Sequence, residues 1–262
     1  MSDRSSPFDS AVFDVDGVLW IAGALGEGTI NFFDNLRKYA IPFCLLTNDC
    51  SVSKAERYEA LTQAGLSLHT DQLVTVADAT REWLINASAE TIMYLGAPST
   101  LLDIAQGFDI RESGPVDAVV VGDLFAHYDR RLLDMAARAV DNGAILVAMQ
   151  RNARWSDGKD WYIDNGFWVA GLEYVTGKQA VVTGKPNQRA YLTAVSRLKQ
   201  VVNDYSHIAF VSDDALTDLK GAKDVGLTTI YFGQERVLPT WVDYSVRDVE
   251  SLTSLIIGRD HD

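Results

Sequence analysis

The sequence is short of positive charge. Its 262 residues hold 23 Lys and Arg against 36 Asp and Glu, which gives a formal net charge of −13. A nucleic-acid-binding protein needs a basic face to displace counterions from phosphates, and no stretch of this chain is dense in Lys or Arg. The same deficit argues against docking on an anionic membrane surface. We therefore expect neither nucleic acid nor a membrane among the partners.

Long apolar runs are missing too, and cysteines are few. No apolar segment approaches the roughly 18 residues that a membrane span needs, and the first ten residues have no signal-peptide pattern. Cys44 and Cys50, the two cysteines, are too few to form a disulfide framework. The composition, 47% hydrophobic and 23% charged, is that of an ordinary globular protein. We expect a cytoplasmic location in a reducing compartment.

Short apolar segments alternate with helical segments along the whole chain. The apolar segments are nearly continuous, which favours strands that helices cover on both faces, as in a parallel sheet. The fold class predicted from this pattern is α/β. The predicted strands are residues 10–15, 42–46, 91–95, 117–121, 144–149, 180–183, 208–211 and 227–232.

Polar residues follow four of these strands directly. Because the carboxyl ends of parallel strands lie at one edge of a sheet, we expect the four clusters to meet in a single site. Carboxylates, a lysine, a hydroxyl and helix N-termini together predict a site for a divalent cation and a phosphate. The clusters are Asp14, Asp16 and Gly17; Thr47 and Asn48; Lys185; and Asp213, Asp214 and Asp218.

Each cluster alone has a plain structural explanation. An Asp-x-Asp-Gly segment also forms solvated turns, Thr-Asn also caps helices, and Asp218 near a helix N-terminus also favours the helix dipole. The pair Gly184 and Lys185 is not a P-loop, because Pro186 replaces the required Ser or Thr and the earlier glycine is missing. The functional interpretation therefore depends on all four clusters together.

The four motifs, in this order, resemble those of the haloacid dehalogenase superfamily. The resemblance covers nearly the whole chain, and the insertion between Thr47 and Lys185 is similar to the type IIA cap of a phosphatase branch. It implies a doubly wound, Rossmann-like parallel-sheet core at residues 1–78 and 179–262, with an inserted α/β cap domain at 79–178. Residues 171–186 are also similar to the phospholysine/phosphohistidine inorganic pyrophosphate phosphatase group.

The resemblance implies hydrolysis of a phosphate ester through an aspartyl-phosphate. Asp14 is the implied nucleophile, and Asp16 is the implied acid and base. A magnesium ion, the implied cofactor, is held by Asp14, Asp213 and the backbone carbonyl of Asp16. The waters on that ion are oriented by Asp214 and Asp218. The phosphoryl oxygens are implied to contact Gly17, Thr47, Asn48 and Lys185.

The sequence departs from the family pattern at three places. At one of them, Asn187 stands where an acidic or small residue is more frequent. Ser212 stands where glycine is commoner, which should be tolerated if the backbone there is ordinary. Asp49 and Cys50 replace the usual residues after Thr-Asn, and an extra acid beside the phosphate site is expected to shift selectivity. None of the three departures removes a catalytic group.

The implied cap is expected to close over the site and exclude water, so the substrate should be a small phosphorylated metabolite. Within the cap, residues 151–168 are polar and aromatic together, and we predict a functional loop there. Arg154 and Trp155 are the candidates to meet substrate anions and rings. The alternative is that these aromatic residues pack inside the cap or form a homodimer interface.

A different class of function stays open beside the phosphatase. The same fold also serves non-enzymatic or regulatory proteins that bind a small ligand. The full set of catalytic carboxylates favours the enzyme. The sequence does not identify the substrate among phosphorylated metabolites.

Overall fold

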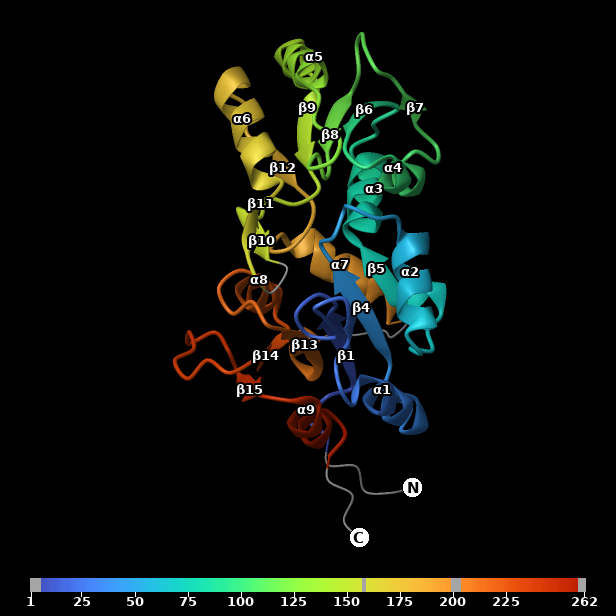
Figure 1. Cartoon of the computed structure of the whole chain (residues 1–262), viewed down its shortest axis with the longest axis vertical. Helices are drawn as coiled ribbons and strands as arrows, with labels where there is room; N and C mark the ends of the chain where they lie inside the picture. Colours follow the sequence, from blue (N-terminus) through green and yellow to red (C-terminus); the bar gives the residue numbers. More distant parts are fainter. Residues whose placement is uncertain (1–5, 157–158, 199–203, 259–262) are drawn as a thin grey trace. The chain divides into compact units, whose positions relative to one another are not determined.

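We analysed a computed structural model, which describes residues 6–156, 159–198 and 204–258 (Figure 1). The chain divides into two compact units. Unit 1 consists of Met1–Thr47, Tyr58–Val74 and Ala190–Asp262, and unit 2 consists of Asn48–Arg57 and Thr75–Arg189. The cap boundaries expected from the resemblance, at residues 79 and 178, stay a prediction.

Unit 1 is built on a six-stranded sheet in the order β15-β14-β13-β1-β4-β5. β1, β4, β13, β14 and β15 pair in parallel. A small antiparallel hairpin of β2 (Trp20–Ile21) and β3 (Ala24–Leu25) follows the first strand. The sheet strands are β1 (Ser10–Asp14), β4 (Phe43–Thr47), β5 (Leu73–Thr75), β13 (Ile208–Ser212), β14 (Thr228–Phe232) and β15 (Tyr244–Val246).

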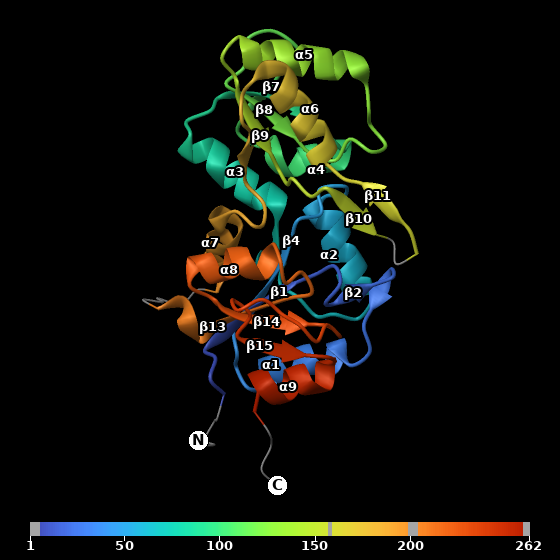
Figure 2. The same cartoon turned by 90° about the vertical axis from the view of Figure 1, so that its left-hand side faces the viewer.

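Helices cover both faces of this sheet, as Figure 2 shows. α1 (Thr29–Lys38), α9 (Val249–Ile256) and the unit 1 part of α2 (Lys54–Gln63) pack on one face. α7 (Gln188–Arg197) and α8 (Asp218–Val225) pack on the other. Phe13 of β1 belongs to the first core cluster and its neighbour Val12 to the second. Successive strand residues face opposite sides, so burial of both faces explains the continuous apolar segments in the sequence.

Unit 2 has its own parallel sheet of five strands in the order β12-β9-β8-β6-β7. α5 (Arg130–Asp141) and α6 (Gly166–Thr176) cover one face, while α3 (Val76–Asn86) and α4 (Pro98–Ile104) cover the other. The α/β fold class predicted from the sequence is confirmed. The strands are β6 (Thr91–Leu95), β7 (Asp109–Ile110), β8 (Ala118–Val121), β9 (Ile145–Ala148) and β12 (Val181–Val182).

The segment 151–168, predicted to be a loop, is partly regular. It contains a short antiparallel hairpin of β10 (Arg154–Ser156) and β11 (Trp161–Ile163), and residues 157 and 158 lie outside the described part of the chain. The loop prediction was wrong here because strands of three residues leave too short an alternation to detect. Across the described residues, no helix is long and apolar enough to cross a membrane.

Candidate active site

Three neighbouring strands of unit 1 end in polar residues at the same edge of the sheet. β13, β1 and β4 lie side by side and end at Ser212, Asp14 and Thr47. The expectation that all four clusters share one sheet edge is wrong for Lys185. The strand before it, β12, pairs with β9 in the sheet of unit 2, with Val181 opposite Val147.

Asp14 is a buried carboxylate at the end of the central strand, with 6% of its surface exposed. Its Oδ1 accepts a hydrogen bond from the backbone N–H of Val15 at 2.8 Å. The Ser212 hydroxyl donates to its Oδ2 at 3.3 Å. The N–H of Val15 orients the carboxylate, and the Ser212 hydroxyl adds a second donor when its proton points to Asp14.

Ser212 links three acids of the site. Its buried Oγ lies 3.1 Å from Oδ2 of Asp218 and accepts the backbone N–H of Asp214 at 3.1 Å. A hydroxyl has one proton, so it donates to either Asp14 or Asp218 at any moment. Ser212 lies in regular strand and its φ is not positive, so a serine is tolerated at this position. The sequence did not predict this linking role.

Asp16 lies just beyond β1 and is exposed, unlike Asp14. Thr47 at the end of β4 donates its hydroxyl to Oδ2 of Asp16 at 3.1 Å. The chain then turns at Gly17, whose φ is +85°. A Cβ at this glycine would lie only 2.1 Å from Oδ2 of Asp213. The carboxylate of Asp213 therefore lies directly against the turn that follows Asp14 and Asp16.

No three His, Cys, Asp or Glu side chains in the described part of the protein are grouped so as to hold a metal ion. The donor set implied by the family needs only two carboxylates, from Asp14 and Asp213. Its third donor is the main-chain oxygen of Asp16.

The remaining two acids shape the start of α8. Oδ1 of Asp214 accepts the backbone N–H groups of Leu216 and Thr217, both at 2.9 Å. Asp218 is buried, and its carbonyl accepts the hydroxyl of Tyr191 at 2.8 Å. Burial first, and then the nearby Asp218 charge, raises the pKa of Tyr191, so this hydroxyl stays protonated and donates.

Lys185 and Asn48 lie together in unit 2. The amide of Asn48 makes two hydrogen bonds to the backbone of Lys185: Oδ1 accepts its N–H at 2.8 Å, and Nδ2 donates to its carbonyl at 2.9 Å. A Cβ on Gly184 would lie 2.6 Å from Oδ1 of Asn48 and 2.5 Å from the carbonyl oxygen of Met149. The glycine of the Gly-Lys-Pro motif is thus needed for close approach, and the Asn48 amide fixes the backbone of a buried lysine.

Arg154 and Trp155 lie on opposite faces of the β10–β11 hairpin, because successive strand residues point to opposite sides. Trp155 stacks on its cross-strand partner Tyr162, with ring centroids 4.7 Å apart. The Arg154 guanidinium lies 5.9 Å from the centroid of the Trp161 ring. A ligand that contacts one face therefore meets one of the two predicted contacts and not both. Arg151, in the same segment, forms an ion pair with Glu173 of α6.

Two family models match the chain. A haloacid dehalogenase-like hydrolase model matches residues 11–111, and a HAD-hydrolase-like model matches residues 182–249. The first contains the Asp14 and Thr47 motifs. The second contains the motifs of Lys185 and Asp213.

Similar proteins are found among sequences and solved structures. Human haloacid dehalogenase-like hydrolase domain-containing protein 2 is 29% identical over 222 residues, which cover 84% of this chain and 82% of that protein. An acid sugar phosphatase from Staphylococcus saprophyticus is 27% identical over 227 residues, 86% of each chain. A glycerol phosphate phosphatase from Mycobacterium tuberculosis, solved with magnesium, superposes with a TM-score of 0.84 at 24% identity over 97% of this chain and 80% of that one. The chain belongs to the haloacid dehalogenase-like hydrolases.

Proposed function

We propose that the protein is a magnesium-dependent phosphatase that hydrolyses a small phosphorylated metabolite through an aspartyl-phosphate on Asp14. The observation that carries the proposal is the buried Asp14 carboxylate, held by two donors at the end of the central strand. Relatives that are named phosphatases bear out the broader prediction that the enzyme is a phosphoric monoester hydrolase.

Asp14 supplies the attacking oxygen. The N–H of Val15 holds its carboxylate, and the Ser212 hydroxyl supports the same orientation when it donates to Asp14, so little reorganisation is needed before attack. As the bond from Asp14 to phosphorus forms, the bond from phosphorus to the leaving oxygen breaks. The leaving oxygen must then gain a proton.

Asp16 is suited to provide that proton. It is exposed, so a substrate can reach it, and the Thr47 hydroxyl fixes one of its oxygens. In the second step Asp16 takes a proton from water, which attacks phosphorus and frees Asp14 and phosphate. A halide leaving group needs no such acid. Asp16 therefore favours phosphate ester hydrolysis over cleavage of a carbon–halogen bond.

The donor chemistry of the same turn fits a magnesium ion. Asp14, Asp213 and the main-chain oxygen of Asp16 offer only oxygen donors, which magnesium prefers. The carboxylate of Asp213 already lies against Gly17, within the turn that bears Asp16. Asp214 and Asp218 would orient waters of such an ion. Bound magnesium neutralises charge on the phosphoryl oxygens.

Lys185 and Asn48 are proposed to bind the phosphoryl oxygens, with Thr47 and the backbone of Gly17. Lys185 brings the positive charge that a phosphate needs in a protein whose net charge is −13. The two Asn48 hydrogen bonds fix the backbone of Lys185. The position of its ammonium group then depends on the conformation of the lysine side chain. Arg154 and Trp155 lie on opposite faces of the hairpin, so one of the two, and not both, is proposed to contact the rest of the substrate.

The test is magnesium-dependent hydrolysis of p-nitrophenyl phosphate by the wild type and by Asp14→Asn. The variant should lose about 10³-fold or more in kcat, as expected when a nucleophile is removed. Asp141→Asn, an exposed position at the end of α5, is the matched control and should retain activity. Retained turnover by Asp14→Asn would refute the nucleophile assignment.

A screen of phosphorylated metabolites by phosphate release would then identify the substrate class. Magnesium binding without release of phosphate from any of them would instead favour a non-enzymatic ligand-binding protein.

A homodimer through the cap is a further part of the proposal. One side of α6 is exposed and uncharged, with bulky Phe167 and Tyr174 at its ends and the small Ala170 and Gly171 between them. This arrangement is self-complementary, since an antiparallel copy places small residues against each other and bulky ones at both ends. Sedimentation should show a dimer that Tyr174→Glu dissociates. A monomeric wild type at high concentration would refute the dimer.

A further inference from the structure

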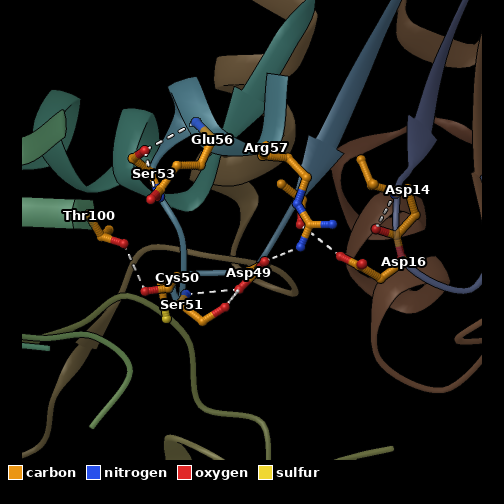
Figure 3. A network of polar contacts seen from close by, with 11 residues as sticks. Asp14, Asp16, Asp49, Cys50, Ser51, Ser53, Glu56, Arg57 and Thr100 are labelled. Carbon is orange, nitrogen blue, oxygen red and sulfur yellow. Dashed lines mark hydrogen bonds and ion pairs between the residues drawn. The ribbon is translucent and has the colours of Figure 1, made fainter. Parts of the chain in front are cut away.

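The loop that links β4 to α2 is held along its length by contacts within unit 2 (Figure 3). At its start, Asn48 makes two hydrogen bonds to the Lys185 backbone. The hydroxyl of Thr100 in α4 donates to the carbonyl of Cys50 at 2.9 Å. At its end, Ser53 and Glu56 form a capping box at the first turn of α2. The loop is therefore a defined structure and not a loose connection.

Asp49 is the central acid of this loop. Its Oδ1 accepts the backbone N–H of Ser51 at 2.8 Å and the Ser51 hydroxyl at 2.6 Å. Its Oδ2 forms an ion pair with Arg57, which comes from the first turns of α2 (Figure 3). Only 17% of the Asp49 side chain and 14% of the Arg57 side chain is exposed. An ion pair this sheltered is screened much less than a pair on the surface.

The position of Asp49 creates an electrostatic problem. It directly follows Asn48, and adjacent Cα atoms are about 3.8 Å apart. An unpaired carboxylate there would repel a phosphate near Asn48 and would compete for the ammonium group of Lys185. A unit charge about 8 Å from a phosphate changes its binding by about tenfold at intermediate dielectric constants. The Arg57 guanidinium removes most of this repulsion.

We infer that Arg57 is a positioning residue that neutralises Asp49, so that a loop with an acid beside Asn48 can serve an anion site. The inference rests on the proposed function, because it takes Asn48 and Lys185 as the phosphate-binding groups. In this role Arg57 acts through Asp49. It explains how the chain accommodates the acid that departs from the family pattern.

The experiment is a double-mutant cycle on Arg57 and Asp49 in the full-length protein. The measurements are kcat and KM for p-nitrophenyl phosphate with magnesium, and the inhibition constant of inorganic phosphate. Arg57→Ala should raise KM and the phosphate inhibition constant by about tenfold, with a smaller change in kcat. Adding Asp49→Asn to it should restore both constants to within about threefold of the wild type, because the lone charge is gone while an amide oxygen still accepts from Ser51.

Arg130→Ala is the matched control. Arg130 is 85% exposed in α5 and pairs only loosely with Asp134, at 4.0 Å, so its loss should leave both constants unchanged. Thermal melting of every variant identifies any that fail to fold. The double variant gives the decisive comparison. If loss of Arg57 acted only by unfolding the protein, adding Asp49→Asn would not restore KM.

Two results would overturn the inference. If the double variant binds phosphate as poorly as Arg57→Ala, Arg57 does not act by neutralising Asp49. If Arg57→Ala binds phosphate as the wild type does, Asp49 does not influence the anion site. Failure of the proposed function is a different outcome, because the wild type would then release no phosphate from any substrate.

Discussion

Gly17→Ala offers a sharp test of the geometry around Asp213. Two separate penalties act at this position. The backbone φ of +85° is in the left-handed region, where an L-residue costs about 1–2 kcal/mol. The added methyl would also lie 2.1 Å from Oδ2 and 2.4 Å from Cγ of Asp213, distances that no real Cβ contact allows. The Asp213 carboxylate must therefore move.

Gly23→Ala separates the two penalties. Gly23 lies in the β2–β3 turn with the same φ of +85°, but a Cβ there would have no atom within 4 Å. The free energy of unfolding of the Gly23→Ala variant, measured by urea denaturation, should fall by the backbone cost alone, about 1–2 kcal/mol. Gly17→Ala should lose at least as much.

The decisive readout is the response to magnesium. Displacement of Asp213 should raise the magnesium concentration for half-maximal p-nitrophenyl phosphate hydrolysis by about tenfold or more in Gly17→Ala. It should also abolish the rise in melting temperature that we expect magnesium to produce in the wild type. Gly23→Ala should keep the magnesium response of the wild type. Equal magnesium dependence in the two variants would refute the assignment of Asp213 to the metal site.

Further predictions concern Ser212, Asn48 and the two cysteines. Ser212→Ala should lower the free energy of unfolding by about 1–3 kcal/mol, because it removes the hydroxyl shared by Asp14 and Asp218; an unchanged urea midpoint would contradict this. Asn48→Ala should lower kcat/KM by tenfold or more, about 1.4 kcal/mol, through loss of both bonds to Lys185, and unchanged kinetics would show that this clamp is dispensable. Burial raises the pKa of the Cys44 and Cys50 thiols, so both should resist a thiol reagent at pH 8 until the protein unfolds. The unfolded thiols ionise above about pH 8.5, while the folded ones keep their protons, so the free energy of unfolding should fall as the pH rises past that value. A free energy of unfolding that does not change with pH there would contradict the raised pKa of the two thiols.

The strands were predictable because burial leaves a direct mark on composition. Strands such as β1 and β13 contact a core cluster on each face, so nearly every residue in them is apolar, and the sequence shows them as uninterrupted runs. The β10–β11 hairpin carries no such mark. Its residues are mostly exposed, and three-residue strands have no measurable period.

The apolar runs that mark the strands do not determine which strands pair with one another. The sequence placed a strand before Lys185, and β12 is there, but it joins the sheet of unit 2. An apolar run requires burial on both faces and does not select among parallel neighbours. This affects the prediction of a single sheet edge for the site, because the strands that precede the four motifs belong to two different sheets.

The sequence by itself determined the α/β fold class, the family and the positions of the candidate residues, because apolar periodicity and short motifs are local properties. Tertiary structure alone decided their partners. Ser212 bonds Asp14 across 198 residues of chain, and Asn48 bonds Lys185 across 137. Such contacts depend on which segments folding brings together, and side-chain hydrogen bonds of this kind leave no periodic signal in the chain.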